Sequence, residues 1–290
     1  MEKIYQDPFP HMIIDNYLPK SEFLELRESI KHHKNNYLKE ESALFTQNKD
    51  QVHFDSIDNK LKEMLKNLCS EAVLKKISSL SGINYKKLIG LGDIQKFGGY
   101  SPYHITPSGG FLGSHVDHSQ INSNGENLMH IANSIFYISE NWEEAWGGQT
   151  ALFSQSGLRL KKLIEPKPNR LIMFLHSAIS FHGVVRYSKD ASLPRETIYN
   201  DYYIKEEDVP EYLISLKSKW NKEYLLTSHK TTCLPIIRFG VRNFFKKSSL
   251  INFFREIKTS RGMYKNYAYY LFNKLLKRRI HKLPRIPFGK

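Results

Sequence analysis

The spacing of apolar residues in the first third of the chain is helical. Residues 23–33 (FLELRESIKHH) follow Pro19 and place apolar side chains three or four positions apart, which predicts an amphipathic helix. The same spacing returns over Ile57–Leu80 and predicts one apolar helical face made of Leu61, Met64, Leu65, Leu68, Ala72 and Val73. Residues 35–56, between these segments, are polar and irregular and are predicted to form a loop or lid.

The period changes from Leu88 onwards. Short apolar segments are separated there by Gly, Asn, Ser and Pro, which is typical of strands joined by turns. Many short strands predict a mainly β fold with flanking helices, of the double-stranded β-helix or jelly-roll type. We therefore expect an N-terminal strand and supporting helices at 1–87, the jelly-roll core at 88–205 and a helical extension at 206–290.

Basic residues concentrate in that extension. The net charge is +14, and residues 205–290 contain 20 Lys and Arg against 6 Asp and Glu, whereas residues 1–204 contain 23 of each kind. The charge therefore says nothing about what the first 204 residues act on. A helix predicted at Tyr264–Ile280 has three interpretations: a solvated face packed on the jelly roll, a patch for an anionic membrane, or a nucleic-acid contact.

Cysteine usage and the N-terminus bear on the compartment. Only Cys69 and Cys233 are present, far apart, which argues against a disulfide framework and suits a reducing environment. The N-terminus lacks a secretory signal pattern, and no run of about 18 apolar residues occurs. We expect a cytoplasmic protein, with a peripheral membrane contact of the tail as an option. The sequence indicates no oligomeric state.

The stretch GSHVDHS, residues 113–119, places two histidines and an aspartate beside a strand-like pattern. Alternate side chains of a strand point to opposite faces, so His115 and Asp117 share a face while His118 points away. The spacing alone is weak, because His53-Phe54-Asp55 has the same form and reads as an ordinary loop.

A third ligand for a metal at this motif would come from another strand. His182 follows the apolar segment Leu171–Leu175 and is the best candidate, whereas His130 reads as an ordinary polar or supporting residue. Two histidines and one carboxylate, with the other coordination positions open, form the facial triad of non-haem Fe(II) oxygenases.

Residues 88–205 resemble the 2-oxoglutarate- and Fe(II)-dependent dioxygenases, in particular the prolyl 4-hydroxylase-like branch. The similar segments, in chain order, are PYH, Gly109-Gly110, HVD, SIFYISENWEEAWGGQTALF, PKPNRLIMFL, SFHGVV and RETIYNDYY. Their order and spacing carry the resemblance. It implies an enzyme that holds Fe(II) through His115, Asp117 and His182 and uses 2-oxoglutarate and O2, with ascorbate as an optional accessory.

The resemblance also implies a cationic anchor for the distant carboxylate of 2-oxoglutarate. A guanidinium suits this carboxylate because it donates two parallel charge-assisted hydrogen bonds. Arg195 begins an alternating strand, and Thr197 shares its face, in the place of the family's Arg-x-Ser pattern. Tyr137 is a candidate phenolic donor to the cosubstrate, and Tyr103 is a further candidate contact.

Arg186 is a rival anchor. The interval from His182 to Arg195 is a few residues longer than is usual in the family, and Arg186 stands four residues after His182. We favour Arg195, because Arg186 would lie on or beside the ligand strand and too close to the iron.

The function implied is hydroxylation of an aliphatic C–H group of an acceptor, with release of succinate and CO2. Peptidyl proline, a free amino acid, or a glycan or lipid precursor would all fit. A DNA-demethylating activity is disfavoured, since the second arginine of that branch is missing from RETIYNDYY. The alternative from another class is a non-catalytic metal- or sugar-binding jelly roll, which would not need Arg195 with Thr197.

Overall fold

The computed structural model describes most of the first 209 residues. The described ranges are 2–31, 37–42, 46–93, 101–117, 120–123, 125–153, 160–177, 180–188, 190–209 and 232–233. The predicted extension at 206–290 lies outside them, apart from residues 206–209 and Thr232–Cys233. In the described ranges, no helix has the length and hydropathy needed to cross a membrane.

In the described residues, fifteen strands form one sheet, and every pairing between them is antiparallel. The main path through the sheet runs β1-β2-β12-β9-β14-β6-β4-β7-β13-β10-β11. The strands are β1 Glu2–Tyr5, β2 His11–Ile14, β3 Tyr37–Ser42, β4 Thr46–Val52, β5 Ile89–Gly90, β6 Tyr103–Thr106, β7 Phe111–Val116, β8 Gln120–Ser123, β9 Glu126–Tyr137, β10 Thr150–Phe153, β11 Leu160–Ile164, β12 Arg170–Leu175, β13 His182–Val184, β14 Arg195–Lys205 and β15 Thr232–Cys233.

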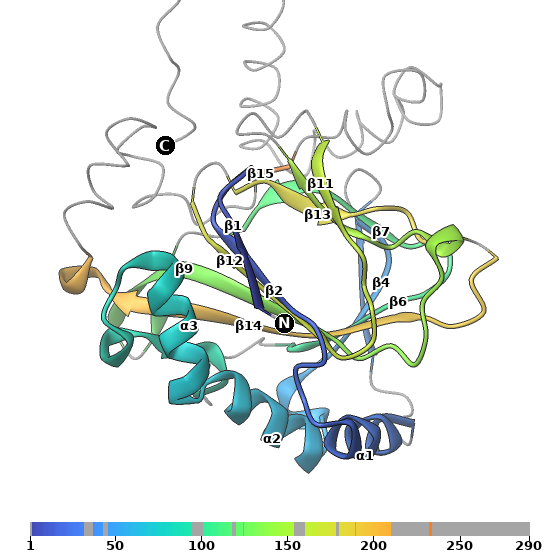
Figure 1. Cartoon of the computed structure of the whole chain (residues 1–290), viewed down its shortest axis with the longest axis horizontal. Helices are drawn as coiled ribbons and strands as arrows, with labels where there is room; N and C mark the ends of the chain where they lie inside the picture. Colours follow the sequence, from blue (N-terminus) through green and yellow to red (C-terminus); the bar gives the residue numbers. More distant parts are fainter. Residues whose placement is uncertain are drawn as a thin grey trace, which may run out of the picture.

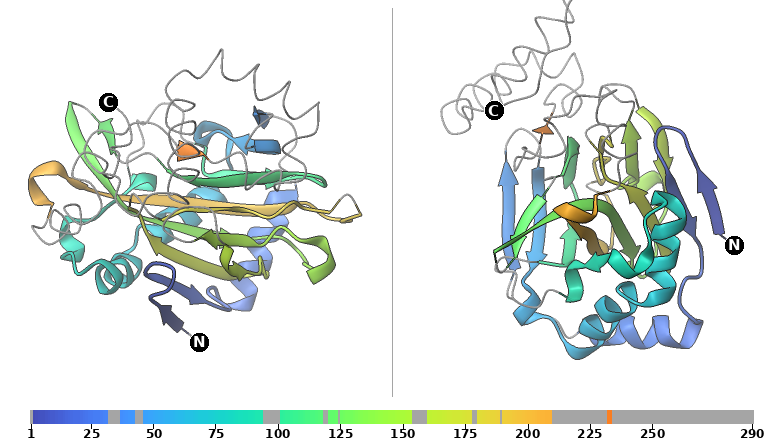
Figure 2. Two further views of the ribbon diagram at one scale, coloured as in Figure 1. Left: turned by 90° about the horizontal axis from the view of Figure 1, so that it is seen from above. Right: turned by 90° about the vertical axis from the view of Figure 1, so that its left-hand side faces the viewer.

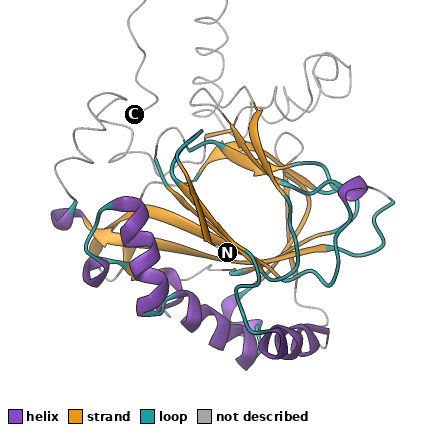
Figure 3. Ribbon diagram, viewed as in Figure 1, coloured by secondary structure: helices purple, strands orange, loops and turns teal. Residues whose placement is uncertain are grey.

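The sheet rolls up on itself (Figures 1 and 3). The two ends of the path meet, because Lys162 of β11 lies over the ring of Tyr5 of β1. Side chains of facing strands fill the interior with an apolar cluster of Phe9, Tyr137, Leu152, Ile164, Ile172 and Phe174. This arrangement confirms the predicted jelly roll.

Three helices cover the outer face of the wall that contains β9, β12 and β14 (Figures 1 and 2). They are α1 Lys20–Lys31, α2 Asn59–Leu68 and α3 Glu71–Ser81, accompanied by 3₁₀ turns at Phe54–Ser56, Tyr85–Lys87, Leu91–Asp93, Glu144–Trp146 and Glu206–Asp208. A second apolar core joins helices to sheet; it includes Leu26, Leu61, Leu65, Leu68, Val73, Ile77, Phe136, Ile198 and Tyr202. The helices therefore cover one face of the sheet, as predicted.

The helical face predicted over Ile57–Leu80 is not continuous. The Asp58 carboxylate caps α2 by accepting a bond from the Leu61 amide at 2.7 Å, and α2 ends at Leu68. A new helix begins after Ser70, so the turn between the two helices resets their rotation. Ala72 is consequently exposed, and its assignment to the buried face was wrong.

The loop or lid predicted at 35–56 is largely a β-hairpin. β3 and β4 pair with each other, and β4 also lies between β6 and β7 in the sheet. The prediction failed because these strands (YLKEES and TQNKDQV) show no apolar alternation. Backbone pairing with neighbouring strands supplies the order that the side-chain pattern does not indicate.

Strand β14 separates the two cores by alternation of its side chains. Arg195 and Thr197 face the interior, whereas Glu196 faces the helices. There the Glu196 carboxylate accepts bonds from Arg27 Nη1 of α1 at 2.6 Å and from the Tyr103 hydroxyl of β6 at 2.5 Å. The Arg27 and Glu196 side chains are each 11% exposed, so this is a nearly dry ion pair between the first helix and the last long strand.

We expect Arg27→Met to lower the free energy of unfolding by about 3–5 kcal/mol, because it leaves the Glu196 carboxylate buried without its cation. Urea unfolding measures this change. Lys60→Ala is the matched control, since it breaks the exposed ion pair with Glu25 and should change stability little. Equal effects of the two substitutions would contradict a structural role for the buried pair.

Candidate functional site

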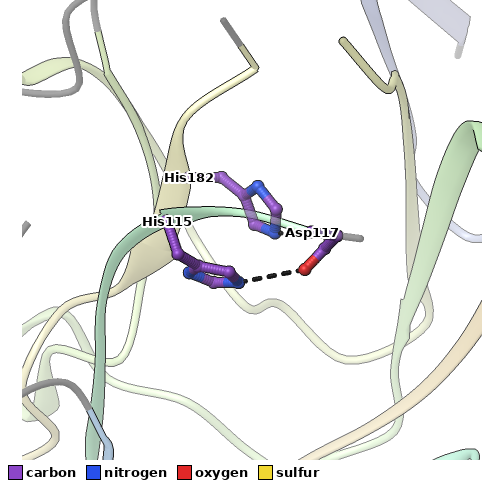
Figure 4. A group of neighbouring side chains, drawn as sticks. All are labelled: His115, Asp117 and His182. Carbon is purple, nitrogen blue, oxygen red and sulfur yellow. Dashed lines mark ion pairs between the residues drawn. The ribbon is translucent and has the colours of Figure 1, made fainter. Parts of the chain in front are cut away.

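Two histidines and an aspartate converge inside the jelly roll (Figure 4). His115 of β7 and His182 of β13 are directly paired across neighbouring strands, and Asp117 follows the last residue of β7. His115 Nε2 lies 3.2 Å from Asp117 Oδ1, and His182 Nε2 lies 3.4 Å from Asp117 Oδ2. One ligand atom from each residue lies within 4.8 Å of the others, and the described residues contain no other group of this kind.

Backbone carbonyls orient both imidazole rings. His115 Nδ1 donates to the Gly113 carbonyl at 2.8 Å, and His182 Nδ1 donates to the Ser180 carbonyl at 3.0 Å. Because a carbonyl only accepts, each ring is assigned the tautomer that leaves a lone pair on Nε2, the atom directed at the cluster. Two imidazole nitrogens and a carboxylate oxygen are the donor set of non-haem Fe(II) sites, so these residues fit that metal.

The protonation states of His182 and Asp117 suit metal binding. Burial lowers the pKa of His182 from 6.5 to about 4, so its imidazole is neutral at pH 7. Burial opposes ionisation of Asp117, but the neighbouring His182 and His115 outweigh that effect and hold its pKa well below 3.8. The site therefore presents a neutral His182 imidazole beside an ionised Asp117 carboxylate.

Glycine at position 183 permits the close approach of the two ligand strands. A Cβ on Gly183 would lie 2.7 Å from the Leu112 carbonyl oxygen and 2.9 Å from that of Gly113. Any larger residue would push β13 away from β7 and separate His182 from His115.

Arg195 lies in the same interior, at the start of β14. Its Nε donates to the Gly148 carbonyl at 2.8 Å, its Nη2 donates to the Thr150 hydroxyl at 3.2 Å, and the guanidinium lies over the Tyr137 ring. The Tyr137 and Thr150 hydroxyls are 2.6 Å apart. Arg195 is 4% exposed, and among the described residues it forms no ion pair with a carboxylate.

The distance along the strands matches a short dicarboxylate. Thr150 lies two residues from Leu152 on β10, and Leu152 pairs directly with His182. Two residues along a strand span roughly 7 Å, so the guanidinium and the His–Asp cluster are separated by about the length of a five-carbon chain.

The structure places the other candidate cosubstrate-binding residues in different surroundings. Thr197 is buried on the inner face with Arg195 and pairs with Tyr137. Arg186 is exposed; its guanidinium donates to the Gly109 carbonyl and lies over the Phe111 ring. Tyr103 is not brought to the site, because its hydroxyl is bound to Glu196 on the helix side.

The neighbour of Tyr103, His104, takes the inward position. His104 pairs with Thr197, and its ring contacts that of Tyr199 with 4.3 Å between centroids. Its Nε2 is buried and has no hydrogen-bond partner among the described residues. Burial, with the positive charges of Lys49 and Arg195, lowers the pKa of His104 well below 6.5, so this ring is neutral.

The remaining histidines near the two motifs also have defined places. His118 lies outside the described residues. His53 and Asp55 form a local pair at a 3₁₀ turn, with side chains 32% and 80% exposed, as expected for an ordinary surface pair. His130 is buried and its Nε2 lies 3.6 Å from Asp201, which is a supporting position.

Sequence reasoning missed the polar side chains that support the cluster. Asn133 and Asp201 could have been found by counting in twos from Tyr137 and Arg195, because alternate residues of a strand share a face. His130 was predicted as an ordinary polar or supporting residue, but this count does not place it on the inner face, because the pairing of β9 with β14 shifts register between Tyr202 and Tyr203.

Comparison with protein families gives a match over residues 100–200 to the 2OG-Fe(II) oxygenase superfamily, a range that contains His115, Asp117, His182 and Arg195. Residues 100–200 form an oxygenase domain of this superfamily. The cofactors of this superfamily are Fe(II), 2-oxoglutarate and O2. This agrees with the resemblance that the sequence motifs indicate.

Solved structures that match the chain include two prolyl hydroxylases. The prolyl-4-hydroxylase of Pseudomonas putida is 13% identical, with 68% of this chain and 92% of that chain covered and a TM-score of 0.47. A prolyl hydroxylase from Trichoplax adhaerens is 18% identical, with 68% and 84% covered and a TM-score of 0.44. HygX from Streptomyces hygroscopicus, with nickel and 2-oxoglutarate bound, is 10% identical, with 67% and 82% covered and a TM-score of 0.46. No curated protein sequence matches the chain.

We expect the free energy of unfolding of the metal-free protein to fall by about 2–3 kcal/mol between pH 7 and pH 4.5 because of His182 alone. Its pKa is about 4 in the folded protein and 6.5 ordinarily, so the unfolded chain gains a proton in this window that the folded chain does not. Acid therefore favours unfolding. Urea unfolding of the wild type and of His182→Phe at both pH values measures the difference; equal losses in the two proteins would contradict a buried neutral imidazole.

Proposed function

We propose that this oxygenase holds Fe(II) with His115, Asp117 and His182, binds 2-oxoglutarate with its distant carboxylate on Arg195, and hydroxylates an aliphatic C–H group of an acceptor with release of succinate and CO2. When bound, the metal supplies the redox chemistry with O2 and the cosubstrate. The chain's own residues bind and orient the metal and the cosubstrate and shield them from water.

The observation that carries the proposal is the buried charge of Arg195. A guanidinium removed from water is costly unless an anion compensates it. The described residues supply no carboxylate to Arg195, whereas the Gly148 carbonyl and the Thr150 hydroxyl fix its direction. A carboxylate of the cosubstrate would complete this arrangement with charge-assisted bonds.

Neighbouring groups support the same assignment. A Cβ on Gly148 would lie 3.3 Å from Cδ of Arg195 and 2.6 Å from the Tyr187 ring, so glycine leaves room for the guanidinium stem. The Tyr137 and Thr150 hydroxyls lie beside the guanidinium and can donate to the same carboxylate. A non-catalytic jelly roll would not need a buried cation at this distance from a His–Asp cluster, which disfavours the binding-module alternative.

Apolar side chains line the path between the cluster and the anchor. Leu152, Ile172 and Phe174 are at most 1% exposed, and the Phe174 ring contacts the His182 ring with 4.7 Å between centroids. They exclude water from the region where the cosubstrate would lie, which strengthens the electrostatic contacts made there. Two classes of acceptor substrate fit this proposal: a prolyl or peptidyl group, and a small molecule.

We expect His115→Ala and His182→Ala each to weaken Fe(II) binding by more than about 100-fold, since loss of a ligand exceeds the effect of losing an outer partner. Both variants should also abolish succinate formation. Anaerobic metal titration and succinate analysis measure the two effects. His53→Ala, which removes a surface imidazole beside a carboxylate, is the control and should bind metal as the wild type does; full activity of either ligand variant would refute the assignment.

We expect Arg195→Ala to raise the dissociation constant for 2-oxoglutarate by at least about 100-fold, because two charge-assisted bonds of about 1.5–3 kcal/mol each are lost. The visible absorption of the anaerobic Fe(II)–2-oxoglutarate complex measures binding. Arg186→Ala removes an equal charge from the exposed rival position and should leave the constant within about twofold. The opposite ranking would assign the anchor to Arg186.

A further inference from the structure

Asp117 needs support from outside its own strand. It follows Val116, the last residue of β7, so the strand ladder does not fix its side chain. Support comes from β9 on the opposite wall of the jelly roll. Asn133 Nδ2 donates to Asp117 Oδ2 at 2.9 Å and to Asp201 Oδ1 of β14, also at 2.9 Å.

The orientation of the Asn133 amide follows from these partners. Both acceptors are carboxylate oxygens, so a flipped amide would place its oxygen against two anions. Both N–H groups are therefore used. The amide oxygen is buried and has no hydrogen-bond partner among the described residues, and Asn133 itself is 6% exposed. The Asn133 amide oxygen thus lacks a partner among the described residues, while both N–H groups are used on carboxylates. This arrangement costs stability, as is expected at a functional position.

Asp201 is itself held firmly. It is 3% exposed and pairs directly with Asn133 across β14 and β9. The Tyr203 hydroxyl lies 3.4 Å from its Oδ2, and His130 Nε2 lies 3.6 Å from its Oδ1. The His130 and Tyr203 rings stack with 5.0 Å between centroids. Asp201 therefore fixes Asn133 to the paired strands β9 and β14.

We infer that Asn133, oriented by Asp201, is a positioning residue that holds the Asp117 carboxylate toward His115 and His182 for metal binding. This inference rests on the proposed function of the cluster. A hydrogen bond to one carboxylate oxygen disfavours chelation by both, so Asp117 would offer the metal a single oxygen. The bond also fixes the metal ligand Asp117, which follows β7, to strand β9 on the opposite wall of the jelly roll.

The test is anaerobic Co(II) titration of the full chain, with chelator competition to obtain the dissociation constant. Asn133→Leu keeps the size of the side chain and removes both donated bonds. We expect its dissociation constant for Co(II) to rise by about 10- to 100-fold, the effect typical of losing an outer partner of a metal ligand. The unfolding midpoint of the metal-free variant is measured in parallel.

Ser134→Ala is the matched control. Ser134 neighbours Asn133 on β9 and is also buried, but its hydroxyl faces the other side and bonds to the Asn200 carbonyl and Tyr202. Its loss should lower stability while Co(II) affinity stays within about twofold. Asn133→Leu with affinity within twofold of the wild type, or an equal loss of affinity in Ser134→Ala, would overturn the inference.

Asp201→Asn gives a second test if Asn133→Leu does not fold. It keeps the volume of the side chain and replaces the anion that orients Asn133, so a several-fold loss of Co(II) affinity is expected with the unfolding midpoint little changed. Unchanged affinity would overturn the inference. Failure of the proposed function is distinct: the wild type would then bind no Co(II), or His115→Ala would bind it equally well.

Discussion

The register of β14 is the constraint on which the rest of the structure depends. One face of this strand carries Arg195, Thr197 and Asp201 into the interior, and the other carries Glu196 toward the helices. A slip of one residue would exchange these faces and place a carboxylate where the site needs a cation. The buried contact of Glu196 with Arg27 and Tyr103 opposes that slip, because each alternative register would leave charges buried without partners.

The electrostatics of the interior follow from burial. Arg195 is buried with neutral partners only, and the His182 imidazole of the His–Asp cluster is buried and neutral. Both features lower the stability of the ligand-free protein, since a buried group that lacks an opposite charge or a bound cation is not compensated. Ligands that supply those charges would stabilise the folded protein by mass action, in proportion to their concentration relative to the dissociation constant. The same features of the interior therefore lower the stability of the ligand-free protein and allow it to bind its ligands.

The sequence predicted the parts of the site that depend on local periodicity. Strand alternation is enough to place His115 with Asp117 and Arg195 with Thr197, and the fold class follows from the many short segments. Tyr103 shows the limit: it and His104 both lie on β6, and only the pairing of β6 with β14 decides which one faces inward. The hairpin β3–β4 and the break between α2 and α3 depend on backbone pairing and on capping, which apolar spacing does not report.

The contacts of the supporting residues could not be predicted from the sequence, for a further physical reason. Strand alternation can place Asn133 on the inner face, but its partners are one carboxylate 16 positions away in the chain and another 68 positions away, and nothing local indicates these contacts. Its position relative to Asp117 exists only once the two walls of the jelly roll have closed. The ligands come from the wall of β7 and β13, whereas Asn133, Asp201 and Arg195 come from the wall of β9 and β14. Closure of the fold and assembly of the site are therefore the same event, and loss of packing between the walls would disturb ligand binding before the protein unfolds.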